Sequence, residues 1–132
     1  MILLDTHTLL WWVQGRPGDL SRKAREAIAA ERQAGEILVS SITAWEIALL
    51  VAYGRLGLST DVQTWLVQVG NVDRLRFVSV DNTIAVAAVH LPGDFHRDPA
   101  DRMIAATARH LDVALVTGDR KLRAYPHVRT IW

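Results

Sequence analysis

Short apolar runs of strand length alternate with segments of helical composition along most of this chain. The first run, residues 1–4, ends at Asp5, and the most regular one, residues 113–116, is followed within three residues by Asp119. An apolar run of this length between polar residues indicates a strand that is buried on both faces. Alternation of such strands with helices predicts an α/β fold whose mostly parallel central sheet is covered by helices on both faces.

The other elements are predicted from composition, from helix caps and from glycine stops. Residues 21–34 form a helical segment with Ser21 as its N-cap and Gly35 as its stop. We predict further strands at 36–40, 76–80 and 128–131, the last one at an edge of the sheet, and further helices at 8–13, 41–53, 61–69, 84–89, 99–110 and 120–124. The helix at 41–53 is apolar almost all round, which predicts that it is buried on most sides.

Composition limits the class of protein. With 132 residues, of which 50% are hydrophobic, the chain is predicted to form one domain, residues 1–132, with a packed core. The net charge is +1, so the choice of partners depends on local patches rather than on the total charge. The chain has no cysteine, which excludes disulfides and thiolate metal sites. We find no signal peptide and no apolar stretch of membrane-spanning length, and we expect a cytoplasmic protein.

Four acidic side chains from distant parts of the chain are predicted to meet at one edge of the sheet. Asp5 and Asp119 follow strands, and Glu46 and Asp101 lie in the first or second turn of helices that begin near the same edge. Right-handed crossovers place the strand-to-helix turns of a parallel sheet on one side, where open α/β sheets bind their ligands. Glu46 is also the one charge of an apolar helix, where charges are usually paired or coordinate an ion.

Bringing four carboxylates together has an electrostatic cost. Two of them 4 Å apart repel each other by about 4 kcal/mol at an effective dielectric constant of 20. Protons or cations must therefore lie between them. Ligation by oxygen alone suits Mg²⁺ or Mn²⁺, and acidic sites that hold these ions commonly serve phosphate chemistry.

The segment 96–102 carries two aspartates with different expected roles. Asp98 precedes Pro99, which is the arrangement of an N-cap followed by proline at the first helical position. Asp101 falls in the first turn, where a carboxylate suits the helix dipole, but the helix is already capped without it. We therefore predict a capping role for Asp98 and a functional role for Asp101, and leave open which of them is the principal metal ligand.

Four stretches of the chain also match the motifs of a known enzyme family. They read LLDTH with LWW at residues 3–12, VSSITAWEI at 39–47, HRDPADRMIAA at 96–106 and LVTGD at 115–119. In this order they resemble the PIN-domain ribonucleases of the VapC toxin type. The resemblance implies a three-layer α/β/α fold and an acidic quartet that maps onto Asp5, Glu46, Asp101 and Asp119. It further implies that Asp98 assists as another acid and that Thr117 supports the site by hydrogen bonding.

The resemblance also implies cofactors and partners. Members of the family cleave RNA phosphodiesters through a metal-activated water, with one or two Mg²⁺ or Mn²⁺ ions. They are usually homodimers, and a cognate antitoxin inhibits them, often through a segment laid across the acidic groove. On this basis we expect a homodimer that acts on RNA and binds an antitoxin protein.

Several residues near the predicted rim are candidates for secondary roles. Contacts with RNA phosphates are expected from Arg97, Arg102, Arg120 and Lys121, with charge balance around the acids as the alternative. His7 and His96 are expected to form hydrogen bonds at the surface rather than to act as catalysts.

Two apolar helices are candidates for interfaces. Helices 9–13 and 84–89 are expected to pack between subunits or against the antitoxin. Trp11 and Trp12 are adjacent in a helix and point about 100° apart, so the two rings are not expected to face one site.

Three other functions fit parts of the pattern. A receiver-type phosphotransfer domain would share the rim acids and a late threonine and lysine, but the chain has no adjacent pair of acids after the first strand. A hydrolase with an aspartyl nucleophile needs an acid two residues after Asp5, where His7 stands. A non-catalytic PIN-like module that binds RNA or protein is the third alternative, and the intact quartet argues against it.

Overall fold

A five-stranded sheet forms the centre of the computed structural model, which describes residues 1–16 and 19–132. The strands are β1 (Ile2–Leu4), β2 (Ile37–Ser40), β3 (Leu75–Val78), β4 (Ala114–Val116) and β5 (Thr130–Ile131). They lie in the order β3-β2-β1-β4-β5, and every pairing between neighbours is parallel. The predicted α/β class with a mostly parallel sheet is confirmed, and the last strand lies at an edge, as expected.

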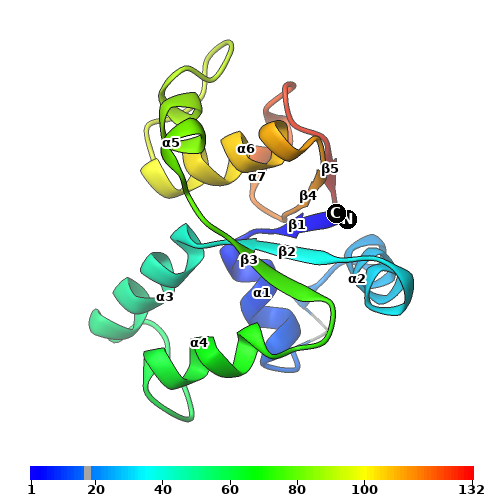
Figure 1. Ribbon diagram of the computed structural model, residues 1–132, viewed down its shortest axis with the longest axis vertical. Coiled ribbons are helices and arrows are strands. Elements are labelled where there is room, and N and C mark those ends of the chain that lie inside the picture. Colours follow the sequence, from blue (N-terminus) through cyan, green and yellow to red (C-terminus); the bar gives the residue numbers. More distant parts are fainter. Residues whose placement is uncertain (17–18) are drawn as a thin grey trace.

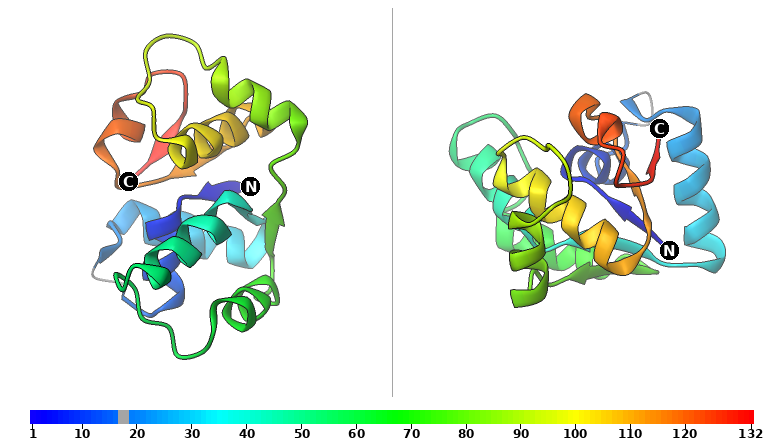
Figure 2. Two further views of the ribbon diagram at one scale, coloured as in Figure 1. Left: turned by 90° about the vertical axis from the view of Figure 1, so that its left-hand side faces the viewer. Right: turned by 90° about the horizontal axis from the view of Figure 1, so that it is seen from above.

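Helices cover both faces of this sheet (Figure 1). One layer contains α1 (Thr6–Val13), α2 (Arg22–Ala34), α3 (Ile42–Ala52) and α4 (Val62–Gly70). The opposite layer contains α5 (Asn82–Val89), α6 (Pro99–Leu111) and α7 (Arg120–Ala124). The sheet lies between the two groups in the left view of Figure 2, which confirms the three-layer arrangement. Within the described ranges, no helix is long and apolar enough to cross a membrane.

Each central strand supplies two separate cores. Ile2 and Leu4 pack with α1, α2, α3 and α4, whereas Leu3, which lies between them, packs with α5, α6 and α7. This alternation follows from the two-residue period of a strand. A register shift of one residue would exchange the two sets of side chains, so the apolar runs fix the register strongly.

Aspartate caps explain where several helices begin. The side chains of Asp5, Asp61, Asp81 and Asp98 each accept a hydrogen bond from the backbone N–H three residues later, and so does that of Ser21. The predicted N-caps Ser21 and Asp98 are therefore confirmed. Helix α1 begins at Thr6 rather than at the predicted residue 8, because Asp5 both ends β1 and caps the next helix.

Helix α3 is less buried than its composition predicts. Only Thr43 and Ile47 of this helix are buried, while Trp45 is 51% exposed. The prediction that α3 is buried on most sides is wrong. The helix lies in the layer that covers the sheet (Figure 1), so one side meets the sheet and its neighbours, while Trp45, Ala48 and Ala52 remain exposed.

Candidate active site

The acidic residues lie where the strand order of the sheet reverses, between β1 and β4. From β1 the chain crosses to β2 and β3 on one side, and it later returns to β4 on the other side of β1. In open α/β sheets such a switch point leaves a crevice outside the carboxyl ends of the two strands, and ligands bind there. Asp5 ends β1, and Thr117 and Asp119 follow β4, so this crevice has acidic walls.

A cavity of about 180 Å³ occupies this crevice. It is lined by Asp5, Thr6, His7, Glu46, Asp98, Asp101, Ile104 and Asp119. All four members of the predicted quartet and the predicted assisting acid Asp98 therefore lie around one space. Helices α3 and α6 contact each other, which brings the carboxylates of two distant segments to the ends of β1 and β4.

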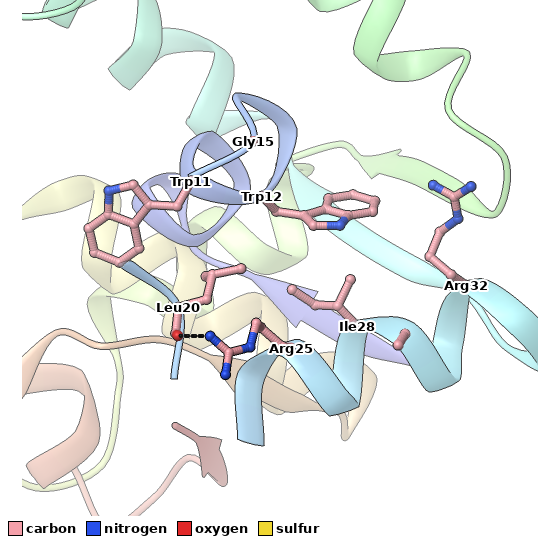
Figure 3. Close-up of a pocket in the computed structure, with 8 residues that line it drawn as sticks. Trp11, Trp12, Gly15, Leu20, Arg25, Ile28 and Arg32 are labelled. Carbon is pink, nitrogen blue, oxygen red and sulfur yellow. Dashed lines mark hydrogen bonds between the residues drawn. The ribbon is translucent and has the colours of Figure 1, made fainter. Parts of the chain in front are cut away.

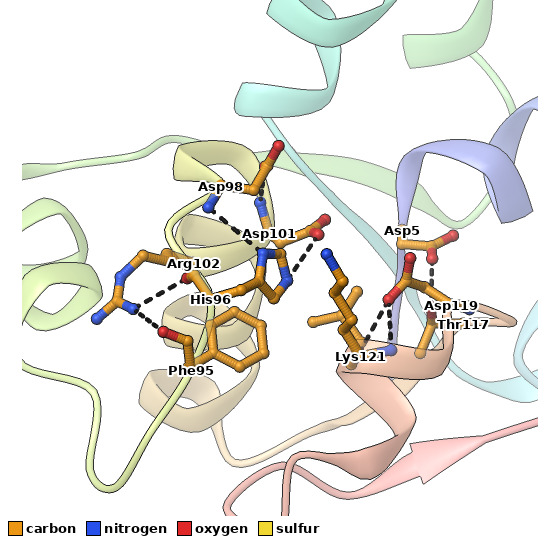
Figure 4. Close-up of polar contacts among 10 residues, drawn as sticks. Asp5, Phe95, His96, Asp98, Asp101, Arg102, Thr117, Asp119 and Lys121 are labelled. Atoms are coloured by element: carbon orange, nitrogen blue, oxygen red, sulfur yellow. Dashed lines mark hydrogen bonds and ion pairs between the residues drawn. The ribbon is translucent and has the colours of Figure 1, made fainter.

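Asp5 is the most enclosed acid of the site, with only 7% of its surface exposed. Its Oδ1 accepts a hydrogen bond of 2.9 Å from the Thr8 N–H, and its Oδ2 accepts one from the Thr117 hydroxyl (Figure 4). Burial raises the pKa of Asp5, and the hydrogen bonds from Thr117 and Thr8 oppose that rise. Both carboxylate oxygens are therefore held in place by the chain itself.

Thr117 also contacts the next acid along the chain. Its Oγ1 accepts a hydrogen bond of 3.1 Å from the Asp119 N–H while its hydroxyl donates to Asp5. The Oδ1 of Asp119 in turn accepts from the N–H groups of Lys121 and Leu122, at 2.9 and 3.0 Å, and so caps α7. One hydroxyl thus connects the acid at the end of β1 to the one that follows β4.

Glu46 is oriented by a threonine that the sequence did not single out. The Thr6 hydroxyl donates to Oε1 of Glu46 and lies 3.0 Å from the Thr43 hydroxyl. Burial raises the pKa of Glu46, the bond from Thr6 lowers it, and the charge of Asp98 raises it again. The spacing gives a partial signal, because Thr43 lies three residues before Glu46 and so shares a side of α3 with it.

Asp101 has a strongly raised pKa. Its pKa is raised from 3.8 to about 7, first by burial and then by the negative charges of Asp98, Asp119, Glu46 and Asp5. Such a shift is expected where several carboxylates share a poorly solvated space.

His96 faces the same carboxyl group. Its Nε2 lies 3.1 Å from Oδ2 of Asp101, the distance of an ion pair, although the buried nitrogen is not aligned for a hydrogen bond (Figure 4). His96 therefore points toward the acids and is only 21% exposed, which is a more internal position than the surface role we expected for it.

The donors around the cavity suit a hard divalent cation. Five carboxylates line it, and Mg²⁺ and Mn²⁺ prefer oxygen ligands of this kind. Across residues 1–16 and 19–132, no three carboxylate or imidazole groups already stand as a ligand cluster. The oxygen donors of these residues fit such an ion.

The basic residues predicted to contact RNA fall into two groups. Arg97, Arg120 and Lys121 are exposed, and Figure 4 shows the Lys121 side chain reaching toward the acids. Arg102 is different. Its guanidinium donates to the carbonyl oxygens of Ala88, Val89, Phe95 and His96, at 2.8 to 3.2 Å. Because these bonds fasten the end of α5 to the segment before α6, we leave Arg102 out of the proposed RNA contacts.

A second, larger cavity of about 630 Å³ lies between α1 and α2 (Figure 3). Its lining comprises Trp11, Trp12, Gly15, Leu20, Arg25, Ile28, Ala29 and Arg32. The prediction that Trp11 and Trp12 cannot face one site is wrong, because the cavity is wide enough to meet both flanks of α1. The Arg32 guanidinium lies over the Trp12 ring, 5.7 Å from its centroid, and Arg25 donates to the Leu20 carbonyl.

Comparison with known proteins agrees with this architecture. A PIN domain is recognised over residues 2–128. The chain is 40% identical over 133 residues to ribonuclease VapC22 of Mycobacterium tuberculosis (strain ATCC 25618 / H37Rv), which covers 99% of this chain and 98% of that protein.

Solved structures with a similar fold come from toxin–antitoxin complexes. A chain of VapBC2 from Rickettsia felis, bound to a DNA fragment from their promoter, has a TM-score of 0.70 at 18% identity and covers 98% of this chain and 97% of that one. A chain of DNA-bound VapBC from Salmonella typhimurium has a TM-score of 0.68 at 22% identity, with coverage of 98% and 95%. At these identities the two structures support the fold alone. The domain match and the ribonuclease relative together show that this chain belongs to the PIN-domain family, beside the VapC ribonucleases.

Proposed function

We propose that this chain is a metal-dependent endoribonuclease and the toxin of a toxin–antitoxin pair. The observation that carries the proposal is the meeting of five carboxylates around one cavity at the carboxyl ends of β1 and β4. The relative that is 40% identical over 99% of the chain is a ribonuclease, which supports RNA as the substrate. We propose that the single domain 1–132 carries the whole activity and acts on RNA in the cytoplasm.

The proposed roles follow from the contacts of each acid. Asp5, Glu46, Asp101 and Asp119 would hold one or two Mg²⁺ or Mn²⁺ ions. A bound ion of this kind lowers the pKa of a water molecule and neutralises charge on a phosphodiester. The Thr117 and Thr6 hydroxyls keep the carboxylates of Asp5 and Glu46 directed into the cavity.

Asp98 and the exposed cations complete the proposed site. Asp98 keeps the auxiliary role that the resemblance implies: it lines the cavity, and its Oδ1 caps α6 through the Asp101 N–H, at 2.9 Å. Arg97, Arg120 and Lys121 remain the proposed contacts for RNA phosphates on either side of the acids.

The test is cleavage of a mixed RNA pool with Mg²⁺ or Mn²⁺ and with EDTA. Wild type should cut only with the metal, and Asp5→Asn should lose activity by a factor of about 100 or more, because a ligand is lost from the metal site. Asp61→Asn is the matched control, since Asp61 is also an N-capping aspartate but lies fully outside the cavity. Loss of activity in both variants, or in neither, would refute the assignment of Asp5.

The proposed partners are a cognate antitoxin and a second copy of this chain. Two of the solved structures similar in fold are VapBC assemblies, which motivates the antitoxin. The cavity between α1 and α2 suits a segment that places apolar side chains against Trp11 and Ile28 and acidic ones near Arg25 and Arg32. In the cleavage assay, the antitoxin should suppress cutting by wild type when it is added before the RNA.

A further inference from the structure

A third cavity, of about 260 Å³, opens directly beside the acidic one on the outer side of α3. Glu46 and Asp98 line both cavities, so the two spaces share a wall. A molecule seated in the third cavity would therefore contact two of the residues that line the acidic cavity. We call this space the α3 cleft and define it by Trp45, Glu46, Tyr53, Arg55, Asp98 and Pro99.

Two aromatic side chains of the α3 cleft, Trp45 and Tyr53, are exposed to solvent. Trp45 is 51% exposed and Tyr53 is 73% exposed, although both line the cavity. Trp45, Leu49 and Tyr53 recur every four residues, which places them along one side of the helix. A large aromatic surface left in water beside a polar site needs a partner to explain it, and the flat face of a nucleobase is one that stacks on such rings regardless of sequence.

The side chain of Arg55 supplies a positive charge in the same cleft. Arg55 is exposed and lines the cavity, and its guanidinium forms no hydrogen bond or ion pair with any residue in the described part of the chain. A guanidinium is well suited to bind phosphate. The cleft thus offers a ring for a base and a cation for a phosphate, next to the acids that are proposed to act on another phosphate.

The charges argue against an apolar occupant. An apolar peptide or an apolar face of a second copy would remove Glu46, Asp98 and Arg55 from water without giving them partners, which is costly. A nucleotide strand carries both apolar faces and charges, with its bases and phosphates at regular intervals. Such a strand would place a phosphate at Arg55, a base on Trp45 and the following phosphate toward the acidic cavity.

The geometry points to a nucleotide subsite in the α3 cleft. In this inference the base next to the scissile phosphate of a single-stranded RNA stacks on Trp45, and Arg55 binds the phosphate on the far side of that nucleotide. The inference rests on the proposed ribonuclease function, which it deepens by assigning a position for the substrate strand. Because stacking is open to every base, the subsite holds and orients the strand and contributes little to choice of sequence.

The test measures binding separately from cleavage. The probe is a fluorescein-labelled single-stranded oligoribonucleotide of mixed sequence, and the protein carries Asp5→Asn and is kept in EDTA, so that no cutting occurs. Fluorescence anisotropy should show that Trp45→Ala weakens binding by about 10- to 100-fold, while Trp45→Phe keeps most of it. Val67→Ala is the control, because Val67 is 57% exposed but lies on α4 outside the cleft, and it should leave the Kd unchanged.

A second measurement identifies the stacked base. Replacing one nucleotide at a time by an abasic one should reveal a position whose loss weakens binding to the Trp45 protein but not to the Trp45→Ala variant, since the two changes remove the same contact. Equal Kd values for Trp45 and Trp45→Ala would overturn the subsite. A different outcome would also overturn it: Trp45→Ala weakens binding, converts a dimer into a monomer, and no abasic position affects binding. In that case the cleft would be the contact with a second copy.

Cleavage by the otherwise wild-type protein separates this inference from the proposed function. Cutting by wild type with unchanged binding by Trp45→Ala would refute the subsite alone. Absence of cutting by wild type, together with the predicted losses of binding, would refute the nuclease and leave a nucleotide-binding cleft. Where both hold, Trp45→Ala should raise KM more than it lowers kcat.

Discussion

The carboxyl group of Asp101 shows how strongly the acids of the site act on one another. Its pKa of about 7 means that near neutral pH this one group is divided between its charged and neutral forms. The causes are burial and four neighbouring carboxylates, and His96 lies on its other side. Binding of a cation requires the charged form, so the protonation of Asp101 and the binding of metal compete.

We expect the affinity for Mn²⁺ to rise as the pH is raised from about 6 to 8, because Asp101 loses its proton in this range. Titration calorimetry in buffers of different ionisation enthalpy should detect the released proton. Asp101→Asn should bind Mn²⁺ more weakly and remove most of this pH dependence. A wild-type affinity that is flat across the range would contradict the assignment of Asp101 as a ligand.

The same group should affect the stability of the metal-free protein. Because folding raises the pKa of Asp101, the neutral carboxyl stabilises the folded protein fully at pH values below the unfolded pKa of 3.8. This contribution is lost as the pH rises through the folded pKa of about 7. At pH 8 metal-free Asp101→Asn should therefore be more stable than wild type, by on the order of 1–3 kcal/mol, measured by urea unfolding. Asp61→Asn serves again as the control and should change little. A less stable Asp101→Asn would mean that the carboxylates do not repel each other as described.

Among the elements, the segment between α5 and α6 depends most on one side chain. Arg102 donates to carbonyl groups at both ends of this segment, and its guanidinium lies 5.9 Å from the centre of the Phe95 ring. Through this segment Arg102 also fixes the path of His96, whose ring faces Asp101. The residue lies in α6 immediately after a proposed metal ligand, yet its contacts are with the backbone.

Replacement of Arg102 by alanine should destabilise the protein by about 2–4 kcal/mol, because several carbonyl groups lose a charged donor. Arg97→Ala is the control, since Arg97 is exposed in the same segment and its loss should cost less than about 0.5 kcal/mol. Thermal unfolding of both variants measures the difference. Equal effects would show that the bonds of Arg102 contribute nothing particular.

The elements themselves were largely predictable, and so was the grouping of acids. Asp5 and Asp119 were placed correctly because strand ends and caps are local features of sequence. The contact between Thr6 and Glu46 joins residues 40 positions apart and depends on how α1 packs against α3, which no local pattern reveals. The carbonyl partners of Arg102 are also distant in sequence and could not be predicted. The exposure of α3 could not be predicted because an apolar composition does not show which side of a helix packs against the rest of the molecule.

At the scale of the whole molecule, two cores are joined by one sheet. Leu3 and Leu38 belong to one core, and Leu4 and Val39 to the other, so β1 and β2 are shared between the two layers. The acidic cavity draws residues from the start of α1, from α3 and α6, and from the segment after β4, and therefore from both layers. Outside the cores, Val86 and Val89 of α5 remain 59% and 70% exposed.

These two valines are the proposed contact between copies in a homodimer. Light scattering coupled to gel filtration should give twice the mass of the chain for wild type and the mass of one chain for Val89→Lys, since a buried charge without a partner is costly. Val67→Lys, on the exposed side of α4, should remain a dimer. A wild type that is monomeric at all concentrations would exclude the homodimer.

The bond between Thr117 and Asp5 joins residues 112 positions apart. While a ribosome is making this chain, Asp5 is synthesised 112 residues before the Thr117 hydroxyl that binds it, and Asp119 follows Thr117. A nascent chain shorter than this has the first strand without the neighbour that orients its carboxylate. The proposed nuclease would therefore stay inactive during translation until the segment with Thr117 and Asp119 has been made, and the RNA from which it is read would be protected from it up to that point.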